Sequence, residues 1–148
     1  MLRHEKGFTL IELLIVVAII GIIAAIAVPN LLTAIQRSKR SRTAADIRAI
    51  GTALGSYQVD NNMFPIQAGG MFSDIAFKPN LATGMTNSYF EGQSKDGWGN
   101  DFYYSGSANG YTLKSYGKDG SSAEAGEFDS NILYINGIFA GPSSIVKK

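Results

Sequence analysis

Glu12 is the one charged residue in an apolar run that extends over residues 8–28. A carboxylate at the centre of a bilayer costs about 2.5 to 3.5 kcal/mol, and somewhat less near the end of a helix, so Glu12 needs a partner. A cut between Gly7 and Phe8 would create an α-amino group four residues before Glu12, on the same face of a helix. The sequence therefore predicts an amine–carboxylate pair, within one subunit or between neighbours, that would set the register of an assembly.

Other reactive side chains give no support for catalysis. His4 is the single histidine and precedes the apolar run, and the chain contains no cysteine. This composition excludes a thiol nucleophile, cysteine-ligated zinc and disulfide bonds. Asp96 and Asp101 suggest a glycosidase-like carboxylate pair, but a turn-rich surface explains them more simply. The sequence predicts a protein that is not an enzyme.

The apolar run must form a helix if it is to position Glu12. At about 1.5 Å per residue, its 21 residues reach across a hydrocarbon core of about 30 Å, which is too long for a cleaved secretory signal. The segment should therefore stay in the mature protein. Pro29 is expected to remove one backbone hydrogen bond and bend the helix, either as a simple membrane-exit kink or as a functional hinge.

Beyond Pro29 the apolar residues become periodic. They recur at spacings of three and four, with basic residues between them: Leu31, Ala34, Ile35, Ile47, Ile50, Leu54 and Tyr57. This pattern predicts one helix from Phe8 to about Asp60, on the order of 80 Å long. Pro65 disfavours helix at Phe64, so the helix should end near residues 60–62.

The rest of the chain predicts a small sheet. Residues 61–100 are expected to form an irregular connector, because Gly, Asn and Ser are frequent and no period is evident. Strands are expected at 101–105, 111–116, 131–135 and 138–140, with turns at 106–110 and at Asn136-Gly137. An antiparallel sheet of three or four strands packed on the second half of the helix would bury both apolar faces, giving an α+β fold.

The start of the chain resembles a known signal. Lys6-Gly7-Phe8-Thr9-Leu10-Ile11-Glu12, followed by the aliphatic run, resembles the class III signal of type IV pilins and type II secretion pseudopilins, closely over residues 3–57. The resemblance implies a type IV pilin-like fold with the apolar half of the helix protruding. It divides the chain into a leader (1–7), a transmembrane and filament-core helix (8–30) and a head domain (31–148).

The same resemblance implies a pathway and partners. A prepilin peptidase would cut between Gly7 and Phe8 and leave Phe8 N-methylated, and the subunit would then polymerise with copies of itself. Glu12 and Pro29 would be the residues that serve assembly. The implied partners are the inner-membrane assembly platform with its ATPase machinery, minor pilins, and the membrane before assembly.

A second resemblance concerns the sheet region. Asp96-Gly97-Trp98-Gly99-Asn100, Phe102-x-Tyr104 and the run from Tyr111 to Gly120 resemble the C-terminal part of the major pseudopilins. In that family a loop after the hairpin binds calcium, and carry-over by position gives these candidate ligands for a structural calcium: the carbonyls of Leu113 and Ser115 and the side chains of Asp119 and Asp129. The family usually ends this loop with Asp-Ala-Asp-Ile, whereas this chain has Asp129-Ser130-Asn131-Ile132. A solvated acidic loop without metal therefore stays open.

Charge and orientation complete the prediction. Four basic residues follow the apolar run (Arg37, Lys39, Arg40 and Arg42), and the positive-inside bias would place them in the cytoplasm. The resemblance instead implies a single-pass protein of the bacterial inner membrane with an exported C-terminus, later part of an extracellular pilus or a periplasmic pseudopilus. The basic segment 30–50 would contact acidic loops of neighbouring heads or anionic lipid headgroups.

Two classes of function remain open on the sequence alone. The first is a filament subunit of a surface type IV pilus or of a secretion pseudopilus. The second is a membrane-anchored calcium- or ligand-binding module that does not polymerise.

Overall fold

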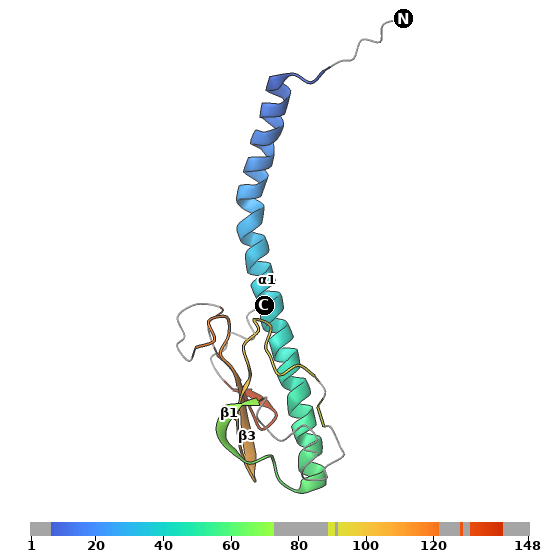
Figure 1. The fold of residues 1–148 in the computed structure, drawn as a ribbon, viewed down its shortest axis with the longest axis vertical. Coiled ribbons are helices and arrows are strands. Elements are labelled where there is room, and N and C mark those ends of the chain that lie inside the picture. Colours follow the sequence, from blue (N-terminus) through green and yellow to red (C-terminus); the bar gives the residue numbers. More distant parts are fainter. Residues whose placement is uncertain (1–6, 73–88, 91, 122–127, 129–130, 141–148) are drawn as a thin grey trace, which may run out of the picture. The chain divides into compact units, whose positions relative to one another are not determined.

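The computed structural model describes residues 7–72, 89–90, 92–121, 128 and 131–140 (Figure 1). Within these ranges it contains one long helix followed by five strands. Contacts divide the chain into two compact units, Met1–Gln36 and Arg37–Lys148. The first unit carries the apolar part of the helix, and the second carries the sheet.

Helix α1 extends from Leu10 to Asn61 and continues without interruption through Pro29. Pro29 lacks the N–H that other helix residues donate to the carbonyl one turn earlier. Two polar side chains near Pro29 donate to backbone carbonyls of the helix. Asn30 Nδ2 donates to the carbonyl of Ile26 and Thr33 Oγ1 donates to that of Pro29, each at 3.1 Å. The predicted end of the helix is confirmed.

The sheet is antiparallel, with strand order β1-β2-β3-β4-β5. The strands are β1 (Gln67–Met71), β2 (Tyr103–Ser107), β3 (Gly110–Ser115), β4 (Ile132–Ile135) and β5 (Ile138–Ala140). The prediction of an irregular connector over 61–100 is wrong at β1, and the sheet has five strands instead of three or four. The sequence of β1, Gln-Ala-Gly-Gly-Met, shows no strand pattern, so its pairing depends on the edge that β2 offers.

Two turns shape the hairpins of the sheet. Only Ala108 and Asn109 separate β2 from β3, so β2 continues through Gly106 and Ser107, where the sequence analysis placed a turn. Asn136 and Gly137 connect β4 to β5 with φ values of 47° and 90°, the left-handed conformation expected for a tight Asn-Gly hairpin turn.

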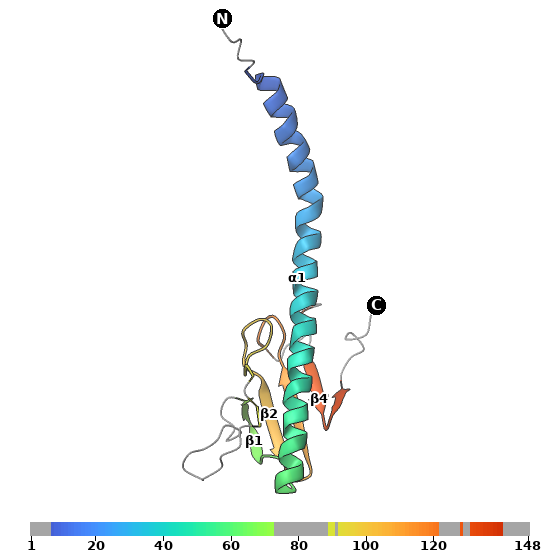
Figure 2. The same ribbon diagram turned by 90° about the vertical axis from the view of Figure 1, so that its right-hand side faces the viewer.

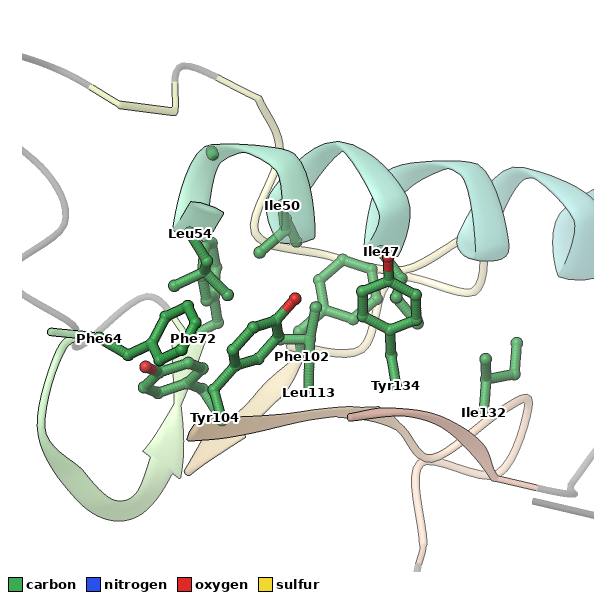
Figure 3. Close-up of a cluster of buried hydrophobic side chains, with 12 residues drawn as sticks. Ile47, Ile50, Leu54, Phe64, Phe72, Phe102, Tyr104, Leu113, Ile132 and Tyr134 are labelled. Atoms are coloured by element: carbon green, nitrogen blue, oxygen red, sulfur yellow. The ribbon is translucent and has the colours of Figure 1, made fainter. Parts of the chain in front are cut away.

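The core of the second unit lies between the C-terminal half of α1 and one face of the sheet (Figures 2 and 3). The helix contributes residues at spacings of three and four, and the strands contribute alternate residues. These side chains are fully buried: Ile47, Ile50, Leu54, Phe102, Tyr104, Leu113 and Ile132.

Candidate functional sites

A capping box begins helix α1. The backbone N–H of Thr9 donates to Glu12 Oε2 at 2.8 Å, and Thr9 Oγ1 donates to the same oxygen at 2.7 Å. In return, the N–H of Glu12 donates to Thr9 Oγ1 at 3.3 Å. Thr-x-x-Glu before an apolar run is the sequence signature of this motif, and the sequence analysis missed it. Glu12 therefore has a partner inside its own chain.

Gly7 and Phe8 precede the helix and are exposed, with 88% of the Phe8 surface accessible. The sequence analysis began the helix at Phe8, whereas the structure begins it at Leu10 with Thr9 as the cap. In the uncut chain Phe8 thus lies before the first turn, outside the helical face that carries Glu12. An exposed, non-helical bond between Gly7 and Phe8 is accessible to a peptidase.

The first unit exposes nearly all of its apolar side chains. Leu10 is 81% exposed and Ile26 is 65% exposed. An 18-residue window of α1 has a mean hydropathy of 3.1, and α1 is the one helix in the described part of the chain that is long and apolar enough to span a membrane. Apolar exposure on this scale marks a surface that a membrane or other protein chains must cover.

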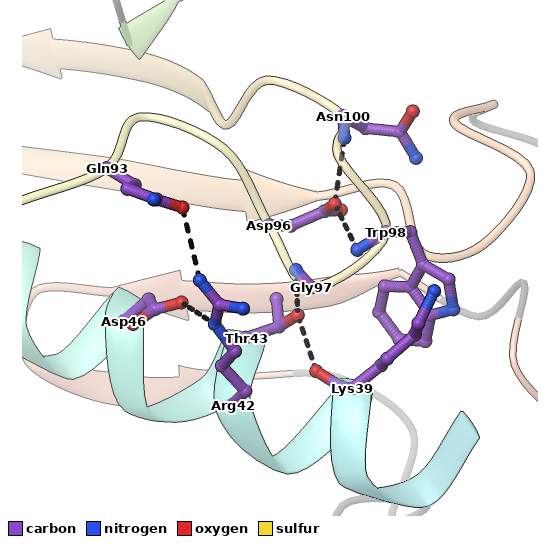
Figure 4. A network of polar contacts seen from close by, with 9 residues as sticks. All are labelled: Lys39, Arg42, Thr43, Asp46, Gln93, Asp96, Gly97, Trp98 and Asn100. Atoms are coloured by element: carbon purple, nitrogen blue, oxygen red, sulfur yellow. Dashed lines mark hydrogen bonds and ion pairs between the residues drawn. The ribbon is translucent and has the colours of Figure 1, made fainter. Parts of the chain in front are cut away.

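The second unit contains a buried carboxylate, Asp96, that accepts three hydrogen bonds. Asp96 is 5% exposed, and its Oδ1 accepts the backbone N–H groups of Trp98 and Asn100, each at 2.9 Å (Figure 4). Its Oδ2 accepts the hydroxyl of Ser115 at 2.7 Å. The sequence analysis noted Asp96 as a member of an imagined catalytic pair. The structure gives it donors from the turn and from β3, while Asp101 lies 3.9 Å from the amine of Lys95.

Three of the four candidate calcium ligands are described, two of them in β3 and one in the loop that follows it. Leu113 and Ser115 are buried in this interior strand, with Leu113 two residues before its end and Ser115 at its last residue. Asp119 is exposed, and its Oδ1 accepts the N–H of Ser121 at 3.1 Å. Asp129 lies outside the described residues, which contain no group of three or more metal-ligating side chains.

The oxygen donors that are described nevertheless suit calcium, which prefers carboxylates and carbonyls. The N–H of Lys118 donates to the carbonyl of Phe128 at 3.1 Å and so joins the two ends of the loop. Lys118 precedes Asp119 and Phe128 precedes Asp129 in the chain.

These features define the class of protein. A membrane-length apolar helix that begins with the Thr9–Glu12 capping box and is followed by a small antiparallel sheet is the pilin-like α+β fold. The fold class predicted from the sequence is confirmed.

Comparison with known families gives the particular family. The model of the type II secretion system (T2SS), protein G matches residues 30–133, and that of the prokaryotic N-terminal methylation motif matches residues 2–28. The chain belongs to the type II secretion system protein G family, the major pseudopilins. This family consists of structural pseudopilins and not of enzymes.

Curated relatives agree with this assignment. The type II secretion system core protein G of Vibrio cholerae serotype O1 is 32% identical over 126 residues, covering 80% of this chain and 86% of the relative. That of Escherichia coli K12 is 35% identical, covering 78% and 83%. That of Pseudomonas aeruginosa is 32% identical, covering 86% and 98%. No solved structure matches the chain significantly.

Proposed function

We propose that this chain is a structural subunit that polymerises with copies of itself into a type II secretion pseudopilus. The observation that carries the proposal is the exposed apolar surface of the first unit. A helix with Leu10, Ile22 and Ile26 each at least 65% exposed is stable in a bilayer and, after extraction, in a bundle of like helices. The segment would act first as a single-pass anchor in the inner membrane and then as a filament core.

Processing precedes assembly in this proposal. A prepilin peptidase cuts the exposed bond between Gly7 and Phe8, and the new amine of Phe8 is methylated. The match of residues 2–28 to the methylation motif supports this step. The mature N-terminus can be read by mass spectrometry of membranes that contain the protein, with a methylated Phe8 as the expected first residue. A chain that still begins at Met1 in those membranes would overturn the filament proposal.

Glu12 pairs with the Phe8 amine of a neighbouring subunit during assembly. Both hydrogen bonds from Thr9 fall on Oε2, and a carboxylate offers about four lone-pair sites, so Glu12 retains capacity for the amine. The pair would set the axial register of subunits, because an unmatched charge in an apolar core is costly.

Two substitutions separate this role from capping. Glu12→Ala removes the charge and the cap, whereas Glu12→Gln keeps an oxygen that can accept the Thr9 bonds but has no charge. Both variants should be processed at Gly7 and both should fail to form filaments, as judged by electron microscopy of sheared material. Normal filaments from Glu12→Gln would show that the charge pair is unnecessary.

The family assignment favours a periplasmic pseudopilus over a surface pilus. We infer that the assembly platform and ATPase of the secretion system, together with minor pilins, are the partners. Electron microscopy of cells that express the chain at native levels provides the test. Long surface fibres containing this chain would favour a surface pilus.

We propose further that the loop after β3 binds a structural calcium ion through the carbonyls of Leu113 and Ser115 and the side chains of Asp119 and Asp129. The hydrogen bond from the Lys118 N–H to the Phe128 carbonyl supports this proposal, because it joins the two ends of the loop. In the sequence, Lys118 directly precedes Asp119 and Phe128 directly precedes Asp129. Calcium should raise the unfolding temperature of the wild-type chain in micelles, since a ligand that binds only the folded state stabilises it. Asp119→Ala should abolish the rise.

The alternative of a membrane-anchored module that does not polymerise makes a different prediction. Such a module would bind calcium but remain monomeric in the membrane after processing. Cross-linking of the mature chain in membranes distinguishes the two, because a ladder of multimers is expected only for the filament subunit.

A further inference from the structure

We propose that the turn formed by residues 94–100 is a clasp on helix α1 that opens on its helix side while the turn itself stays folded on the sheet. With the clasp closed, the second unit holds α1 from Lys39 onward. With the clasp open, it holds α1 from Ala44 onward. Opening therefore frees the segment 39–43, roughly 7 Å of helix, for contacts with other chains.

The hold of the second unit on α1 begins with a polar residue. Thr43 is fully buried and is the first buried residue along this helix. Its Oγ1 donates to the carbonyl of Lys39 at 2.9 Å and accepts the N–H of Gly97, also at 2.9 Å (Figure 4). Buried apolar residues of α1 begin only at Ala44, so the helix before Ala44 is held without a buried apolar side chain of its own.

Gly97 brings the turn against the backbone of the helix. A Cβ atom at this position would clash with the carbonyl of Lys39 and would lie 3.0 Å from Thr43 Oγ1, so only glycine permits the approach. The hydrogen bond between Gly97 and Thr43 is partly buried. The turn is therefore seated on α1 by a close polar contact.

A second contact between the helix and this region is exposed. Arg42 Nη2 donates to Gln93 Oε1 at 3.1 Å, and Arg42 Nε also lies 3.6 Å from a carboxylate oxygen of Asp46 (Figure 4). Water competes for exposed polar groups, so such contacts stabilise a structure by at most about 1 kcal/mol. This contact adds little to the hold on the helix.

The turn is bonded more firmly to the sheet. The buried carboxylate of Asp96 accepts the N–H groups of Trp98 and Asn100, and its other oxygen accepts the hydroxyl of Ser115, the last residue of β3. Asn100 Nδ2 donates to the carbonyl of Gly117 at 2.8 Å. The bond between Asp96 and Ser115 is buried and charge-assisted, a kind of bond that is costly to break because each partner would be left unsatisfied.

This difference decides where the contact separates. A local opening follows the boundary that breaks the fewest buried interactions. On the helix side the bonds are partly buried or exposed, whereas on the sheet side they include a buried carboxylate. The turn should therefore stay with the sheet when the start of the docked helix is released.

Amide hydrogen exchange of the full-length protein in detergent micelles, followed by NMR, tests this directly. The N–H of Gly97 bonds to the helix, whereas those of Trp98 and Asn100 bond within the turn. The protection factor of Gly97 should be about tenfold or more below those of Trp98 and Asn100. Equal protection at all three amides would mean that the turn opens as a whole, which would overturn the proposal.

Thr43→Val opens the clasp by substitution. Valine has nearly the same shape and helix propensity as threonine but leaves the Gly97 N–H without its acceptor. The amides of residues 43–46, which bond to the carbonyls of residues 39–42, should exchange about five- to tenfold faster. Exchange at Ile50 and Leu54, in the apolar core, should stay unchanged.

Two controls isolate the hydroxyl of Thr43. Thr43→Ser retains it and should restore the protection of residues 43–46. Thr52→Val removes an exposed hydroxyl from the same helix, one that donates to the carbonyl of Arg48 at 3.0 Å. It should leave residues 43–46 as they are in the wild type.

Gly97→Ala provides a second variant, which decides the question if Thr43→Val does not fold. The added Cβ meets the Lys39 carbonyl, so the turn must withdraw from the helix. Residues 43–46 should again exchange faster, while Trp98 and Asn100 keep their protection. The proposal is overturned if residues 43–46 exchange as in the wild type, or if Ile50 and Leu54 lose as much protection as they do.

Discussion

Thr9 and Glu12 bond to each other in both directions, with Glu12 Oε2 lying 2.7 Å from Thr9 Oγ1 and 2.8 Å from Thr9 N. The reciprocal bonds satisfy two donors at the start of the helix, where backbone N–H groups have no helical partner. A carboxylate is also favoured there by the positive end of the helix dipole. Glu12 thus has a role within each subunit besides the proposed pairing between subunits.

Removing the hydroxyl of Thr9 should loosen the first turn of α1. Thr9→Val abolishes the acceptor for the Glu12 N–H, at a cost of about 1 kcal/mol, so the amides of Glu12 and Leu13 should exchange about fivefold faster. Hydrogen exchange of the full chain in micelles measures this change. Thr9→Ser is the matched control and should exchange like the wild type. Equal protection in all three proteins would contradict the importance of the cap.

Two glycines one helical turn apart should respond oppositely to alanine. A Cβ at Gly51 would lie 2.5 Å from Tyr134 Cε1, whereas a Cβ at Gly55 meets nothing within 4 Å. Gly55→Ala should raise the free energy of unfolding by about 0.5 to 1 kcal/mol through helix propensity. Gly51→Ala should lower it by about 1 to 2 kcal/mol, because a ring in the core must shift. Denaturant unfolding of both variants tests the sign, and a gain in both would refute the packing of Tyr134 against α1.

The head should lose stability in alkaline solution. Burial raises the pKa of Tyr111 from its ordinary value of 10 to about 12, and burial also raises the pKa of Tyr104. Between pH 10 and 12 the unfolded chain loses these protons while the folded chain keeps them, so the free energy of unfolding falls as the pH rises. Thermal unfolding at pH 8.5, 10 and 11 should show the decline.

The matched control for this pH effect is Tyr111→Phe. It removes the hydroxyl of Tyr111 and leaves that of Tyr104, so the decline between pH 10 and 11 should be shallower than in the wild type. A decline of unchanged steepness would mean that Tyr111 does not titrate as its burial implies.

The hairpin of β4 and β5 should be secured by Phe139. Its ring lies 4.7 Å from that of Tyr134 in an edge-to-face contact, and the guanidinium of Arg48 lies 4.8 Å from its centre. Phe139→Ala should reduce the free energy of unfolding by roughly 1 to 2.5 kcal/mol. Ile138→Ala, at a position that is 72% exposed, should change it by less than about 0.5 kcal/mol. Similar losses from both substitutions would contradict the packing of Phe139 against Tyr134. Both of these residues lie beyond residues 30–133, the range that the family model matches.

The sequence by itself determined those features that depend on neighbours along the chain. The apolar run and its length fix a membrane-length helix, the spacing of Ile47, Ile50 and Leu54 fixes its buried face, and Pro65 limits its end. The capping box of Thr9 and Glu12 is also a local feature, because the Thr-x-x-Glu pattern is its sequence signature. Asn136-Gly137 likewise indicated the last hairpin before any contact was known.

Only the tertiary structure decided the features that depend on residues distant in the chain. β1 is a strand because β2 offers an unpaired edge, although Gly69 and Gly70 have no strand preference of their own. Asp96 reads as a surface turn residue in sequence, yet its donors include Ser115, 19 residues away, and its turn is seated on Thr43, more than 50 residues back along the chain. Such contacts arise from packing of the sheet on the helix, which no local pattern encodes.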